Sequence, residues 1–223
     1  GIAALRDLDL SVPGYKYDIA FSANRIPTEP LVNSFVPERK GQVHGYTVGN
    51  AQIRGAGVTG ASLQKNLTGQ FAFASTNLGL SIADVRSPLI NSVINVIVGI
   101  PDLIRNPTAT IGNLLTAFKG GSGTKGGFAD QLTAHPIENI TVRGRAGQGV
   151  VALEQAEVRS AAFEAAANGN INLAQVLTNS TLHIPVHVAL SRPLAEKVGL
   201  AGNTPTNQPM AALPDFLTLT GTL

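Results

Sequence analysis

Apolar and polar residues alternate strictly in several segments of this chain, and this period of two constrains the fold more than any other feature. In residues 182–190, leucine, isoleucine and valine alternate with histidine, proline and alanine. Successive side chains of a β-strand point to opposite faces of a sheet, so such a segment has one apolar and one polar face. The sequence therefore predicts a mainly β protein of antiparallel strands, each with one face on a core or a ligand. The same pattern recurs in residues 7–12, 15–22, 69–74, 140–145, 163–173 and 217–222.

Proline interrupts the alternation at two places. Pro185 stands in the middle of segment 182–190. Because proline has no backbone N–H to donate, it predicts an edge strand or a β-bulge there. Pro13 and Gly14 separate segments 7–12 and 15–22, which are therefore expected to form a hairpin or one bent strand.

Residues 87–118 follow helical spacing instead. From Leu89 to Ile97, apolar residues recur as on one face of a helix, and Ser87 with Pro88 forms a suitable helix start. A second helix is expected at 108–118, so we expect a helical insertion within residues 87–134. This insertion either packs over one side of the sheet, or plugs a groove or contacts a membrane. Shorter helices are expected at 28–36, 173–177 and 192–198.

The composition limits the possible partners. Only 13% of the 223 residues are charged, about half of the usual share. The formal net charge of +2 comes without a basic run, so no nucleic-acid partner is expected. The chain has no cysteine, which excludes disulfides and thiol chemistry. Its length suits one large β domain, and we expect residues 1–223 to be a single domain cut from a longer protein.

Two histidines have a spacing that would bind a metal on a helix. His183 and His187 are four residues apart in the most regular of the predicted strands. On a strand this separation is roughly 13 Å, which is too far for two ligands of one metal ion. We therefore expect both side chains to lie on the solvent face, and we expect no metal and no cofactor.

Catalytic motifs are equally weak. The close acidic pairs are Asp7 with Asp9 and Glu154 with Glu157, and both fit the wet side of a strand or turn. No glycine-rich segment ends in the Gly-Lys-Ser/Thr of a phosphate loop, and no G-x-S-x-G motif is present. A hydrolase would need an acid pair assembled from distant positions, so we expect a non-enzymatic protein with no catalytic residue.

Two stretches resemble the AsmA family of bacterial envelope proteins, which are relatives of bridge-like lipid transfer proteins. The first is "GAGVTGASLQKNLTGQFAFASTNLGLSIADV", residues 55–85, in which one departure is that Leu78 separates Asn77 from Gly79. The second begins at "ENITVRGRAGQGVVALE", residues 138–154, and continues through residue 190. The matching positions are Gly55, Gly57, Leu63, Leu67, Gly69, Leu78, Gly79, Ile82, Gly149, Val150, Gly169, Ile171 and Leu173.

This resemblance implies a strongly curved, open antiparallel sheet whose apolar concave face forms a groove. It also implies a periplasmic location, with an inner-membrane anchor formed by an N-terminal helix that is not in this chain. The implied function is phospholipid binding that contributes to lipid transport or to outer-membrane assembly. The expected ligand is a phospholipid or another molecule with acyl chains, and an envelope protein is a possible further partner.

The residues expected to bind lipid come from the apolar sides of the predicted strands. An aspartate at Ile184 or Val186 is expected to abolish lipid retention while the strand persists. The alternative is an interaction module with a closed β core, which recruits an envelope partner through a strand edge. The expected lipid-binding residues are Phe71, Phe73, Ile140, Val142, Ile184, Val186 and Val188.

Overall fold

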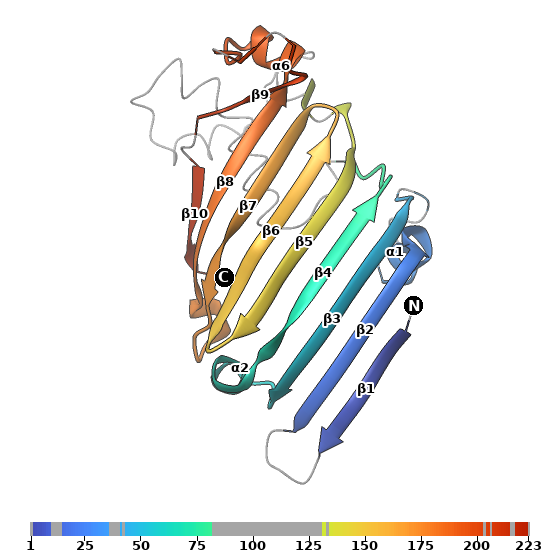
Figure 1. Cartoon of the computed structure of the whole chain (residues 1–223), viewed down its shortest axis with the longest axis vertical. Coiled ribbons are helices and arrows are strands. Elements are labelled where there is room, and N and C mark those ends of the chain that lie inside the picture. The colour runs from blue at the N-terminus through green and yellow to red at the C-terminus, as the bar shows by residue number, and fades with distance from the viewer. Residues whose placement is uncertain are drawn as a thin grey trace.

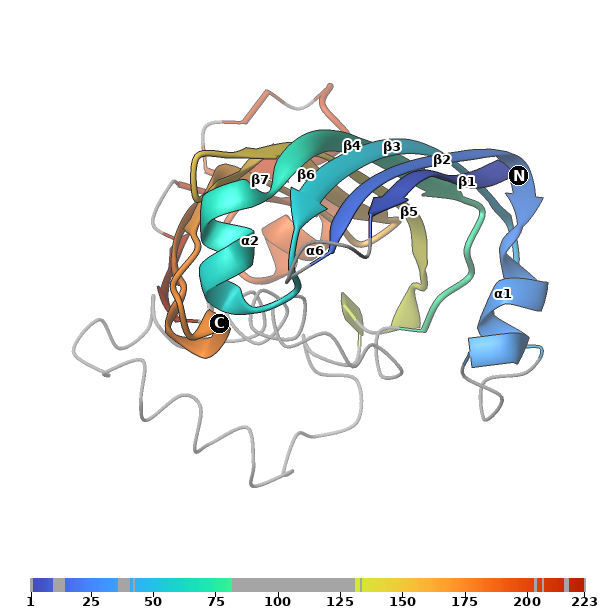
Figure 2. The ribbon, with the colours of Figure 1, turned by 90° about the horizontal axis from the view of Figure 1, so that it is seen from below.

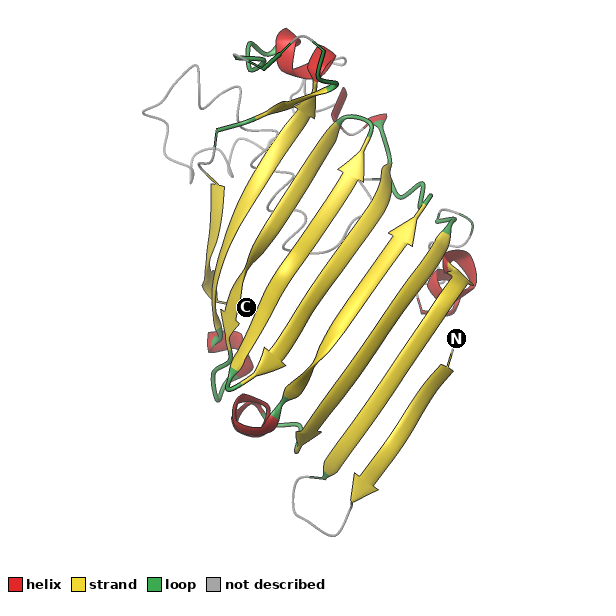
Figure 3. Cartoon of the chain, viewed as in Figure 1, coloured by secondary structure: helices red, strands yellow, loops and turns green. Residues whose placement is uncertain are grey.

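The computed structural model describes residues 2–9, 15–35, 41, 43–81, 131–132, 134–202, 204–205, 207–214 and 217–222. These residues form one antiparallel sheet with strand order β1-β2-β3-β4-β5-β6-β7-β8-β10, and β9 pairs with β8 as well (Figures 1 and 3). The prediction of a mainly β, antiparallel fold is confirmed. The strands are β1 (Ile2–Asp9), β2 (Lys16–Pro27), β3 (Tyr46–Ala56), β4 (Thr68–Thr76), β5 (Ile137–Gly147), β6 (Val150–Ser160), β7 (Phe163–Asn172), β8 (Thr181–Ser191), β9 (Met210–Ala212) and β10 (Leu217–Thr222).

The sheet is curved and open. Seen along the strands, it forms an arch from β1 to β8 (Figure 2). In the part of the chain that the structure describes, β1 pairs only with β2 and β10 pairs only with β8, so the two ends of the arch do not meet. The expectation of an open, curved sheet is therefore correct.

Short helices connect the strands. The expected helices near 28–36 and 192–198 are present as α1 (Thr28–Phe35) and α6 (Arg192–Lys197). The helix expected at 173–177 is wrong, because the chain instead forms a single 3-10 turn, η3 (Leu177–Asn179). One helix was not expected, α2 (Gly60–Asn66) between β3 and β4. The helical insertion expected at 87–118 lies outside the described residues.

Cross-strand register places the apolar residues of all the central strands on one face. Directly opposed residues of an antiparallel sheet share a face. Two β-bulges, one after Ala23 in β2 and one between Leu153 and Ala156 in β6, absorb extra residues and keep the apolar sides in phase. A row of successive partners shows the result: Ala23, Gly49, Phe73, Val142, Ala156, Ala167 and Val186.

The edge or bulge predicted at Pro185 is wrong. Strand β8 is paired on both sides, by β7 and by β10. The β7–β8 ladder has paired residues up to Ala167–Val186 and again from Asn170–His183, with no shift of register between them. Pro185 cannot donate a ladder hydrogen bond, so this interruption accommodates it within an internal strand.

The buried core lies at the β7–β8 end of the sheet. There, residues of β7, β8 and β9 pack with α6 and the segment after β9. Full burial of a large aliphatic side chain contributes about 1.5–3 kcal/mol, so this cluster anchors the fold. Its members are Leu132, Ile137, Ala162, Phe163, Ala165, Leu182, Ile184, Val186, Val188, Leu190, Leu194, Ala195, Ala211 and Leu213.

Candidate functional site

The seven predicted lipid-binding residues lie on the same face of the sheet. Ile140 and Val188 belong to one row of cross-strand partners, which runs through Val158 and Ala165. Phe73 and Val142 are partners in the row that ends at Val186. Helix α6, whose Leu194 and Ala195 belong to the core cluster, lies beneath the arch (Figure 2). The apolar side is therefore the concave face.

Burial divides these seven residues into two groups. Ile184, Val186 and Val188 are only 3%, 3% and 6% exposed, as members of the core cluster. The other four, Phe71, Phe73, Ile140 and Val142, are half-buried. A ligand therefore has access to the β4–β5 part of the face, whereas the β8 part already serves as a protein core.

Three aromatic rings form a cluster on the accessible part of the concave face. The ring centroids of Phe71 and Phe73 are 6.4 Å apart and those of Phe21 and Phe73 are 5.7 Å apart. We call Phe21, Phe71 and Phe73 the aromatic patch. Phe21 was absent from the predicted set, although its alternating segment was recognised, because only the β2–β3–β4 pairing shows that it lies beside Phe73.

Glycines in neighbouring strands make room for these rings. A Cβ atom on Gly49 would overlap the ring of Phe73, and one on Gly144 would lie 2.7 Å from Cζ of Phe71. Tyr17 covers Gly55 in the same way at the other end of β3. An aromatic ring that covers a strand glycine replaces the packing that glycine lacks. Glycine residues in these strands therefore leave the space in which aromatic rings of the neighbouring strands pack against the sheet.

The concave face carries no charge in the central strands. Among the residues that the structure describes in β2–β8, the register places no charged side chain on this face. Burial also raises the pKa of the Tyr17 hydroxyl, as expected for a phenol in apolar surroundings. The face thus offers contacts for hydrocarbon and little for an ionic ligand.

Charged groups gather on the opposite, convex face. Arg54 forms an ion pair with Asp18 at 2.9 Å, and Arg145 forms one with Glu154 at 2.8 Å. Hollows of about 430, 360 and 340 Å³ also lie on this side, and Asn50 lines all three. Phe73 is among the residues that line the first hollow, Phe21 the second and Phe71 the third. Most of the other lining residues belong to the convex rows.

A metal-binding cluster is not found in the region that the structure describes. No group of three histidine or acidic side chains there is arranged to hold a metal ion. His183 and His187 are both exposed and lie on the convex side of β8, as the alternation predicted. Glu154 and Glu157 lie on the same side, where Glu154 is paired with Arg145 and Glu157 accepts a hydrogen bond from Gln155.

Helix α2 lies at one end of the sheet, between β3 and β4. It begins at the N-cap Thr59, whose hydroxyl accepts a hydrogen bond of 3.2 Å from the N–H of Ser62. A Cβ atom on Gly60 would overlap the carbonyl oxygen of Gln175, beyond β7. The helix therefore links the β3–β4 connection to the β7–β8 connection at one end of the strands (Figures 1 and 2).

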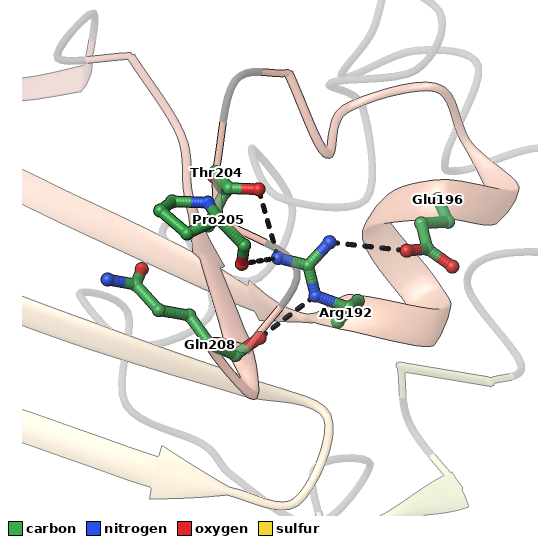
Figure 4. A network of polar contacts seen from close by, with 5 residues as sticks. All are labelled: Arg192, Glu196, Thr204, Pro205 and Gln208. Atoms are coloured by element: carbon green, nitrogen blue, oxygen red, sulfur yellow. Dashed lines mark hydrogen bonds and ion pairs between the residues drawn. The ribbon is translucent and has the colours of Figure 1, made fainter.

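A different polar network fixes the chain at the core end. Arg192, at the start of α6, donates from Nε to the carbonyl of Gln208 at 2.9 Å and from Nη2 to the carbonyls of Thr204 and Pro205. It also forms an ion pair with Glu196 at 3.3 Å (Figure 4). Every observed partner belongs to α6 or to the loop before β9, so Arg192 has a structural role.

Comparison with known proteins leaves the chain without an assigned family. No family model matches it, and neither a curated protein nor a solved structure shows significant similarity. Within the described ranges, no helix is long and apolar enough to cross a membrane.

Proposed function

We propose that this chain is a non-enzymatic, lipid-binding module of the AsmA type, which holds acyl chains on the concave face of its sheet. One observation carries the proposal: the aromatic patch is half-buried on a face where the register places no charged side chain across β2–β8, in a sheet that is open at the β1 side. A continuous apolar face of this kind suits a hydrocarbon chain better than any polar substrate.

The energetics favour transport as well as binding. Burial of each CH₂ group contributes about 0.8 kcal/mol, wherever along the face the group lies. A chain that slides along such a face keeps most of this contribution, so movement needs no catalytic residue. The proposed role is therefore to carry phospholipid, or to contribute to outer-membrane assembly, in the periplasm. An inner-membrane anchor outside this chain would hold the module there, as the AsmA resemblance implies.

A second candidate is an interaction module that adds a strand at its edge. Charged residues and proline in an edge strand usually prevent it from pairing with another chain. β10 is six residues long and contains neither. β1, at the other edge, contains three charged residues and a β-bulge. A partner strand from an envelope protein would therefore pair with β10.

A matched pair of substitutions in β3 tests the lipid-binding proposal. Ala51 lies on the concave face between its partners Phe21 and Phe71, and Gln52 is the next residue on the convex face. Ala51→Asp places a carboxylate in the aromatic patch, whereas Gln52→Asp places the same group in solvent. The measurement is binding of a fluorescent fatty acid presented in phosphatidylethanolamine–phosphatidylglycerol vesicles.

We expect Ala51→Asp to weaken binding roughly tenfold or more and Gln52→Asp to leave it unchanged. Both variants keep the same strand and gain the same side chain, and circular dichroism checks that both remain folded. Equal affinities for folded Ala51→Asp and wild type would exclude the concave face as the binding site. Loss of partner binding on deletion of β10, with lipid absent from all forms, would favour the interaction module.

A further inference from the structure

Hydroxyl groups interrupt the apolar concave face at its α1 end. Thr47 of β3 and Ser75 of β4 are cross-strand partners, and their hydroxyl oxygens are 2.8 Å apart. The hydroxyl of Thr28, the first residue of α1, lies 3.1 Å from that of Thr47. We call these three residues the hydroxyl ladder. Ser75 also pairs with Ile140 of β5, so the ladder borders the apolar surface directly.

The chemistry of the ladder suits a carbonyl or carboxyl oxygen. A hydroxyl group both donates and accepts a hydrogen bond, and hydroxyls linked in a chain polarise one another, which strengthens a bond at the end of the chain. In an acyl lipid, the carbonyl group marks the boundary between the hydrocarbon chain and the polar head. The ladder marks the corresponding boundary on the protein.

The opposite end of the face is apolar and lies beside α2. Ile53 lies on the same face of β3 as Thr47, six residues further along, which corresponds to roughly 20 Å. This distance is comparable to the length of an extended long acyl chain. Beyond Ile53, α2 lies at this end of β3, where the side-chain amide of Asn66 donates a hydrogen bond of 3.2 Å to the carbonyl of Ala56.

We propose that a bound acyl chain lies along β3 and β4, with its carbonyl group on the hydroxyl ladder and its methyl end toward α2. The ligand class is then a long-chain fatty acid or an acyl ester, and Thr47 and Ser75 set its direction. This inference rests on the proposed function, and it adds a polarity that an evenly apolar groove would not have.

Single-tryptophan variants can read this direction, because the chain contains no tryptophan. Phe73→Trp places the reporter two residues from Ser75 in β4, and Ile53→Trp places it at the α2 end. Two probes are compared, doxyl-stearic acid with the nitroxide beside the carboxyl group and the isomer with the nitroxide near the methyl end. If Phe73→Trp lowers the native circular-dichroism signal, its cross-strand partner provides the substitute reporter, Val142→Trp.

The expected result is a crossed pattern of quenching. The carboxyl-side nitroxide quenches the tryptophan at position 73 more strongly than the one at position 53, and the methyl-side nitroxide does the reverse. Equal quenching or the opposite pattern would overturn the direction but leave lipid binding intact. The opposite pattern would arise if the carboxylate paired with the exposed Lys65 of α2. No saturable quenching by either probe would overturn the direction and the proposed function together.

Removal of the hydroxyls provides a second test in the Phe73→Trp background. The double change Thr47→Val and Ser75→Ala keeps the shape of the ladder and removes two hydrogen-bonding groups. We expect a loss of affinity of about five- to tenfold and a weaker difference between the two probes. Thr141→Val, on the convex face of β5, is the control and should change neither. An unchanged probe difference in the double variant would overturn the role of the ladder.

Discussion

At the scale of single residues, glycine determines how closely these strands approach one another. Gly69 in β4 has a φ of +150°, and a Cβ atom there would overlap the backbone carbonyl oxygen of Gln52 in β3. Gly169 in β7 has a φ of +156° and lies in the same way against the carbonyl oxygen of His183 in β8. No side chain fits at either position without moving the neighbouring strand.

We therefore expect Gly69→Ala to lower the free energy of unfolding by about 2–3 kcal/mol. Gly147, near the end of β5, is a matched control, since a Cβ atom there meets nothing within 4 Å. Chemical denaturation of the two variants beside wild type measures the difference. Similar stabilities for Gly69→Ala and Gly147→Ala would show that the β3–β4 approach is not as tight as described.

Tyr17 gives the residue-scale prediction for pH. Burial raises the pKa of its hydroxyl above the ordinary value of 10.0. Its contribution to stability is therefore fully present below pH 10 and is lost as the pH rises through the folded-state pKa. Denaturation midpoints measured across alkaline pH should fall more steeply for wild type than for Tyr17→Phe. Parallel curves for the two proteins would mean that the phenol is not held in apolar surroundings.

At the scale of elements, the sequence predicted strands better than connections. Alternation of apolar and polar residues is a property of each strand alone and does not depend on its neighbours. Strand segments such as 182–190 were therefore recognised from the sequence. Helix α2 was missed because "TGASLQKN", residues 59–66, is too short to show helical periodicity, and its only signal is the N-cap Thr59. Pro185 was misread because sequence shows the missing N–H but not that the β7–β8 ladder is interrupted at that point.

The candidate site was predictable only in part, for the same reason. Alternation placed Phe71 and Phe73 on the apolar side. It could not show that Val186 is buried in a core, or that Phe21 lies beside Phe73, because both facts depend on which strands are neighbours. The hydroxyl ladder also needs the pairing of β3 with β4, since Thr47 and Ser75 are far apart in the sequence.

Arg192 gives the prediction at this scale. Its planar guanidinium bonds three carbonyl groups and one carboxylate, a geometry that lysine cannot reproduce. Arg192→Lys should lower the free energy of unfolding by about 1–2 kcal/mol and increase hydrogen exchange around residues 204–208. Lys197→Ala, an exposed change in the same helix, is the control. Unaltered exchange in Arg192→Lys would mean that other contacts hold this loop.

At the scale of the whole molecule, the concave face has two roles. At the β7–β8 end it is a closed core, and at the β2–β5 end it presents a half-buried aromatic patch. This division corrects the expectation for aspartate at Ile184 or Val186. The substitution was expected to remove lipid and keep the strand, but it should instead destabilise the fold. Both side chains are 3% exposed, and burial of an unpaired carboxylate there costs several kcal/mol.

Val186→Asp should accordingly unfold the chain or shift its thermal midpoint sharply downward, whereas Ala51→Asp should leave the fold intact. Thermal denaturation followed by circular dichroism distinguishes the two variants. A native-like midpoint for Val186→Asp would contradict the assignment of the β7–β8 end as the core.

The most direct test of the central claim is native mass spectrometry, with organic extraction, of the chain purified from bacteria without detergent. We predict near-stoichiometric phospholipid or fatty acid on wild type and on Gln52→Asp, and a marked loss from Ala51→Asp. A wild-type protein that stays free of lipid, even after incubation with liposomes, would contradict the claim and favour the interaction module that uses the β10 edge.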